Sequence, residues 1–116
     1  MIEDIRLEDI RVTESSGNVF ADLGLPNAEE ALAKAELAIA INRIMEGRGL
    51  TERQTALILG TSQSRIHNVR RGRLTGVSTD WLFHALNNLG HDVEINVKPK
   101  PHHRTDARTT VATHPR

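Results

Sequence analysis

The stretch that most constrains the fold is residues 50–73, which read LTERQTALILGTSQSRIHNVRRGR. The pattern predicts two short helices joined by a tight turn. Thr51 and Gln54 have the spacing of a capping box, so the first helix is expected to begin there. Gly60 is expected to end it, with a positive φ. Ser62 is then a good N-cap for the second helix. Residues 50–73 therefore predict a compact helical hairpin.

The second helix of this pair, expected over residues 63–71, has two chemically different faces. Ile66 and Val69 form the apolar face, where they can meet a core, and Ala56 of the first helix allows close approach. The 100° step of a helix then turns five polar side chains outward, namely Gln63, Ser64, His67, Asn68 and Arg71. Amides pair bidentately with adenine and arginine pairs with guanine, while the helix N-terminus attracts phosphate. Taken singly, each residue is also ordinary for a helix surface; together they favour a DNA-reading face.

The charge distribution is compatible with that reading, although the formal net charge is zero. Residues 1–36 hold nine acids and three bases, whereas the remainder holds twelve bases and six acids. The asymmetry indicates a basic binding region beside an acidic segment, with a solvated arginine-rich surface as the alternative. Five further arginines could contact the DNA backbone: Arg43, Arg48, Arg53, Arg70 and Arg73.

Two more helices are expected around this pair. The first begins at Asn27, runs for about five turns to a double-glycine stop, and carries Leu37, Ile41, Ile44 and Met45 on one face. The other is capped by Ser78 or Thr79, ends at Gly90, and has an apolar stripe of Leu82, Ala85, Leu86 and Leu89.

The remaining segments are extended or unassigned. HDVEINV, residues 91–97, alternates apolar and polar side chains and predicts a short strand. Residues 1–25 fit either a strand or a frayed helix. The predicted fold is mainly α, a compact helix-turn-helix bundle of four to five helices with a short C-terminal β-strand. The predicted organisation is an acidic N-terminal segment (1–25), a DNA-binding domain with a dimerisation strand (26–98) and a flexible tail (99–116).

Residues 50–72 resemble the helix-turn-helix of Cro/cI-type regulators, also called XRE-type. The likeness rests on Ala56, Gly60, Ile66, Val69 and the opening Ser62-Gln63-Ser64. It implies that Gln63, Ser64 and Asn68 read bases while Thr51 and Ser62 contact phosphate. The predicted DNA-binding residues are Thr51, Ser62, Gln63, Ser64, Arg65, His67, Asn68 and Arg71. The family often has glutamine where this chain has Glu52, and an acid there should repel phosphate, so no phosphate contact is assigned to it.

A longer stretch, residues 17–99, resembles HigA-type antitoxins of bacterial toxin–antitoxin operons, most distinctively in NVFADLGLP. This resemblance implies a dimer that represses its own operon by binding double-stranded operator DNA and that neutralises a messenger-RNA-cleaving toxin. Residues 91–97 are the expected homodimer contact, and pairing with the N-terminal IRLEDIRVT is the alternative. Likewise, residues 1–25 either contact the toxin or form a solvated acidic tail. A repressor without a toxin, or an interaction module with no DNA role, is the alternative function.

Catalytic and membrane roles are not expected. The chain has no cysteine, and it has no phosphate loop or nucleophile elbow. His102 and His103 beside Asp106 lack a rigid third ligand for a metal. We therefore predict no enzyme activity, no metal and no cofactor. The absence of an apolar run near the roughly 20 residues of a membrane span, and of a secretory signal, predicts a cytoplasmic protein with no membrane contact. Trp81 is expected to be a core or rim anchor, with a dimer contact as the alternative.

Overall fold

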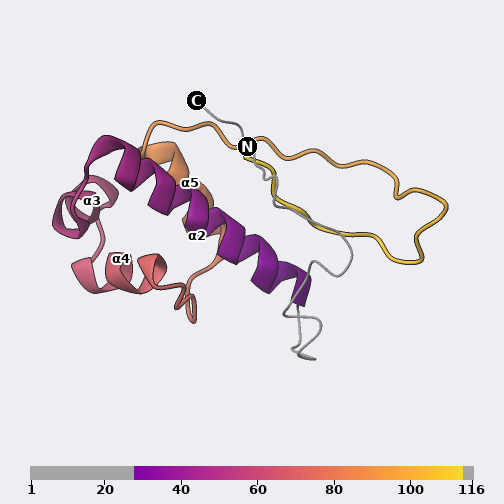
Figure 1. Cartoon of the computed structure of the whole chain (residues 1–116), viewed down its shortest axis with the longest axis horizontal. Coiled ribbons are helices and arrows are strands. Elements are labelled where there is room, and N and C mark those ends of the chain that lie inside the picture. The colour runs from indigo at the N-terminus through magenta and orange to yellow at the C-terminus, as the bar shows by residue number, and fades with distance from the viewer. Residues whose placement is uncertain (1–27, 114–116) are drawn as a thin grey trace. The chain divides into compact units, whose positions relative to one another are not determined.

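The computed structural model describes residues 28–113, and these residues contain helices and no strand. The four helices are α2 (Ala28–Arg48), α3 (Glu52–Leu59), α4 (Gln63–Arg70) and α5 (Thr79–Asn88). In Figure 1, α3 follows the C-terminal end of the long α2, α4 comes next along the chain, and α5 lies behind α2. The predicted mainly helical class is confirmed. The expectations for residues 1–25 and for a cap at Asn27 lie outside the described residues.

α2 buries the face that its sequence pattern predicts. Leu37, Ile41 and Met45 are buried, and Ile44 is half-buried beside them. The helix continues through Gly47 and ends at the second glycine of the predicted stop. There Gly49 has a φ of 64°, and the Leu50 N–H donates to the Met45 carbonyl at 2.9 Å. This hydrogen bond satisfies a carbonyl that the end of the helix would otherwise leave unpaired.

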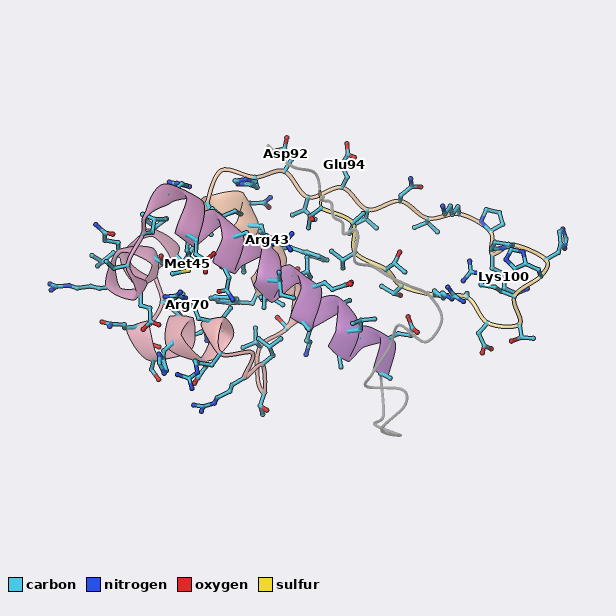
Figure 2. All side chains as sticks on the ribbon, viewed as in Figure 1. Arg43, Met45, Arg70, Asp92, Glu94 and Lys100 are labelled. Atoms are coloured by element: carbon cyan, nitrogen blue, oxygen red, sulfur yellow. The ribbon has the colours of Figure 1, made fainter. Side chains whose placement is uncertain are left out.

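Residues 34–96 form a compact unit with one apolar core. Each of the four helices contributes to this core through aliphatic side chains; the most deeply buried are Ile41, Met45, Ile66, Val69, Leu82 and Leu89. Figure 2 labels Met45, which lies among the helices. Thr55 is the buried polar residue among those described, and its hydroxyl donates to the Thr51 carbonyl at 2.9 Å. Burying this hydroxyl is tolerated because its hydrogen bond is satisfied.

α5 completes the core with its apolar stripe. Ser78, one of the two predicted caps, is the residue that accepts a hydrogen bond from the Trp81 N–H, at 3.0 Å. The whole predicted stripe is buried, since Leu82, Ala85, Leu86 and Leu89 are each at most 6% exposed. The Arg48 guanidinium donates to the Leu89 carbonyl at 2.7 Å and ties the end of α2 to the end of α5.

The predicted C-terminal strand is wrong for the described part of the chain. Residues 91–97 are extended without strand pairing, although Asp92 and Glu94 project to the same side as the alternation predicts (Figure 2). The side-chain alternation is therefore present, but a strand also needs a neighbouring backbone to complete its hydrogen bonds. Ile95 and Val97 are 72% and 90% exposed, which leaves the apolar side of the segment uncovered.

The chain after residue 97 has turns and no helix or strand as far as residue 113. The Arg104 N–H donates to the Pro101 carbonyl at 3.2 Å, and the Thr109 N–H donates to the Glu29 carboxylate at 3.3 Å. Among the described residues, no helix has both the length and the apolar character that crossing a bilayer requires.

Candidate nucleic-acid interface

The α3–α4 pair is held at a fixed angle by its turn and its caps. Gly60 has a φ of 65° and a ψ of 38°, in the left-handed region that a side chain disfavours. Thr51 and Gln54 form the predicted capping box, with hydrogen bonds of 2.9 and 3.0 Å. Ser62 accepts from the Arg65 N–H at 3.0 Å and starts α4. The local sequence signals therefore produce the predicted helical hairpin.

α4 separates its apolar and polar side chains as predicted. Ile66 and Val69 are each 1% exposed and pack into the core. Gln63, Ser64 and His67 are exposed, as is Arg71 directly after the helix, and Asn68 is half-buried. Amide, hydroxyl and imidazole groups are thus collected on one side of a short helix whose other side is fixed by packing.

Four of the eight predicted site residues also line one shallow hollow beside α4, of about 220 Å³. These are Ser62, Ser64, Arg65 and Asn68. The segment after α4 supplies the opposite wall through Arg73, Thr75 and Val77. Thr51, Gln63, His67 and Arg71 do not line this hollow. Because its walls carry hydroxyls, an amide and two guanidinium groups, the hollow suits an acceptor-rich, negatively charged group.

Glu52 makes a cross-helix contact that the sequence interpretation missed. Its carboxylate lies 3.2 Å from His67 Nδ1 and 3.7 Å from Arg70 Nη1. Glu52 therefore braces α4 from the start of α3. Only the position of Glu52 could have indicated this contact, because it opens α3 at a point where the family often has glutamine, and a carboxylate there can pair with a histidine and an arginine of the next helix.

Two of the five arginines expected at the DNA backbone already have partners within the chain. Arg48 is held by the Leu89 carbonyl, and Arg70 is paired with Glu52. Figure 2 labels Arg70 on α4; its carbonyl also accepts from the Asn42 amide of α2, at 3.3 Å. Arg65 is different, since its guanidinium carbon lies over the Trp81 ring, 5.2 Å from the ring centroid.

A helical hairpin that packs one face into the core and turns the polar face of its second helix to solvent is typical of the helix-turn-helix class, which acts by placing that second helix in the major groove of DNA. Comparison with known proteins agrees with this assignment. A family model described as a helix-turn-helix domain matches residues 19–98. A solved structure described as an XRE-family transcriptional regulator is similar at a TM-score of 0.73 and 36% identity, covering 77% of this chain and 100% of that one. Curated protein sequences contain no significant match. The chain belongs to the helix-turn-helix domain family and is similar to XRE-type transcriptional regulators.

Proposed function

We propose that this protein is a sequence-specific repressor that binds double-stranded operator DNA through α4. The observation that carries the proposal is the outer face of α4, where polar side chains lie opposite the buried Ile66 and Val69. In this proposal Gln63, Ser64 and Asn68 contact base edges. The proposed role is binding rather than catalysis, and we propose that it is performed in the cytoplasm.

The two capping hydroxyls have a proposed role at the DNA backbone. The oxygens of Thr51 and Ser62 accept backbone N–H groups at 3.0 Å, which leaves each hydroxyl proton available. A phosphate oxygen can accept that proton while the cap stays intact. His67 donates through Nδ1 to Glu52, so its Nε2 remains for a contact with DNA. Arg65 and Arg71 complete the proposed interface.

We further propose that the repressor is a homodimer formed through residues 91–97. The backbone of this segment has no strand partner among the described residues, and Ile95 and Val97 are exposed. A second copy related by a two-fold axis could supply both the missing strand and an apolar cover. Such a dimer would present two α4 helices to a palindromic operator.

The finer proposal is that the protein is an antitoxin that represses its own operon and neutralises a messenger-RNA-cleaving toxin. Its support is the likeness of residues 17–99 to HigA-type antitoxins, and the acidic N-terminal segment is the proposed toxin contact. An adjacent gene for a small basic ribonuclease-like protein, whose toxicity is relieved by co-expression of this chain, would support an antitoxin. A gene with no such neighbour would indicate a repressor that has no toxin partner.

The base-reading role is tested by Gln63→Ala. The operator is first selected from random duplexes with the wild-type protein, and binding to that duplex and to single-base variants is then measured. Loss of one bidentate contact should cost about 1–3 kcal/mol and relax the preference at one base position per half-site. Asn88→Ala removes an exposed amide from α5 and serves as the control. If Gln63→Ala keeps the full preference of the wild type, α4 does not read bases as proposed.

The alternative function, a protein-interaction module with no DNA role, is tested by the salt dependence of DNA affinity in the same binding experiment. Arginine–phosphate contacts release counterions, so a DNA-binding protein should lose affinity steeply as salt is raised. No selected duplex, or affinity that does not change with salt, would favour the interaction module.

A further inference from the structure

Arg65 and Trp81 occupy equivalent positions in two different helices. Each is the third residue of its helix, and each backbone N–H donates to the capping serine at 3.0 Å, Arg65 to Ser62 and Trp81 to Ser78. Both backbones are therefore fixed by a cap. Both side chains are half-buried, and the guanidinium carbon lies 5.2 Å from the ring centroid. The stacked pair bridges the start of α4 and the start of α5.

The stacking leaves the hydrogen-bonding edge of Arg65 available. A guanidinium group carries its five N–H donors in its plane, so a ring against its face does not occupy them. Within the described residues, no carboxylate or carbonyl is paired with the Arg65 side chain. Arg48 and Arg70 differ in this respect, because each is already bonded within the chain.

The surroundings of Arg65 indicate what the available edge could bind. Arg65 lines the hollow of about 220 Å³ beside α4, together with Ser62, Ser64 and Arg73. Two guanidinium groups and two hydroxyls favour a group with paired acceptor oxygens. On DNA, that chemistry is offered by a backbone phosphate, and by the O6 and N7 atoms of guanine.

We infer that Trp81 is a positioning residue that holds the Arg65 guanidinium edge-on toward paired acceptors of the bound DNA. The inference rests on the proposed DNA-binding function and extends it to α5, a helix that contributes none of the predicted site residues. A stacked arginine is restrained before DNA arrives, so less side-chain freedom is lost on binding. Without the Trp81 ring, the Arg65 side chain would lose its conformational freedom only when DNA binds.

The test is a double-mutant cycle on affinity for the selected duplex, with Arg65→Gln, Trp81→Leu and the double variant. Cation–π stacking of this kind predicts that each single variant binds about threefold to tenfold more weakly, and that the double variant is little worse than Arg65→Gln. Trp81→Phe should restore most of the binding because it keeps an aromatic face. Phe83→Leu removes an aromatic ring from the same helix and should leave affinity unchanged. Circular dichroism confirms that each variant is folded.

Two further readouts separate positioning from a merely structural role. Trp81 is the one tryptophan of the chain, so its emission reports directly on the stacked pair; operator binding should change it in the wild type and much less in Arg65→Gln. Arg65→Lys identifies the acceptor, because lysine keeps a charge for phosphate but loses the planar fork. If Arg65→Lys keeps both the wild-type dependence of affinity on salt and the wild-type base preference, the acceptor is a backbone phosphate. If the variant loses its preference at one base position, the acceptor is a guanine.

A folded Trp81→Leu variant with wild-type affinity would overturn the inference, as would fully additive losses in the double variant. Failure of the wild-type protein to select any duplex would instead refute the proposed function.

Discussion

Glu52 places a negative charge at the start of α3, on the helix pair that is proposed to approach a polyanion. Its carboxylate is 24% exposed and contacts both His67 and Arg70. These partners lie on α4, so the acid orients that helix while partly neutralising its positive charge. Partly exposed ion pairs of this kind contribute about 0–1 kcal/mol to folding. The larger effect of Glu52 is therefore expected in DNA binding.

Glu52→Gln should strengthen DNA binding and change stability little. The amide oxygen can still accept from His67 Nδ1, but the variant releases Arg70 and removes the repulsion of phosphate. We expect an affinity gain of about threefold to tenfold at low salt, which shrinks as salt screens the charges. Fluorescence anisotropy with the operator duplex at several salt concentrations measures the effect.

Glu46→Gln is the control for that substitution, because it removes an exposed acid from α2 with the same change in net charge. An equal gain in both variants would mean that only the net charge of the protein matters. No gain in Glu52→Gln would show that the acid does not oppose phosphate.

The helices could be predicted from the sequence because their signals are local. Gly60 and the capping serines Ser62 and Ser78 act within a few residues of themselves, and periodicity defines the buried faces. Contacts between helices carry no such signal. Glu52 and His67 are fifteen residues apart, and Arg65 meets Trp81 only because α5 packs near α4. The prediction of a strand at 91–97 was wrong for the same reason. Alternation of apolar and polar residues specifies which side chains share a side of the segment, but it does not specify whether a second backbone lies beside it.

The helix pair offers a matched test of its turn. Gly60 has a φ of 65°, whereas Gly47 lies inside α2 and has no positive φ; an added Cβ would meet nothing within 4 Å at either position. Steric crowding therefore cannot cause a difference between alanine at Gly60 and alanine at Gly47. The difference between the two positions is their backbone conformation. Gly60→Ala should lower the free energy of unfolding by about 1–2 kcal/mol, because alanine is strained in the left-handed region. Gly47→Ala should raise it by up to about 1 kcal/mol.

Urea denaturation followed by circular dichroism measures both changes. Similar effects of the two alanines would mean that the turn does not depend on the left-handed conformation of Gly60.

Among residues 28–113, the large apolar side chains that are exposed fall into two groups. Ile39, Leu57 and Ile58 lie on α2 and α3, and Ile95 and Val97 lie on the extended segment. The helical residues already have their backbone hydrogen bonds, so a second copy would offer them only apolar contact. The extended segment would gain both backbone pairing and apolar cover. Residues 91–97 are thus the contact that we propose between two copies.

Ile95→Asp should convert the proposed dimer to a monomer. Ile95 is 72% exposed, so aspartate at this position removes no core packing, but it would set two like charges close together across a two-fold strand pair. Sedimentation velocity should show a single species near the monomer mass of 12.9 kDa. The affinity for the operator should also fall when the dimer is lost, because a palindromic site would then be bound by two independent monomers. Leu57→Asp is the matched control, since Leu57 is 75% exposed on α3. A dimer that persists in Ile95→Asp, or that is lost in Leu57→Asp instead, would move the contact away from residues 91–97 and onto the helices.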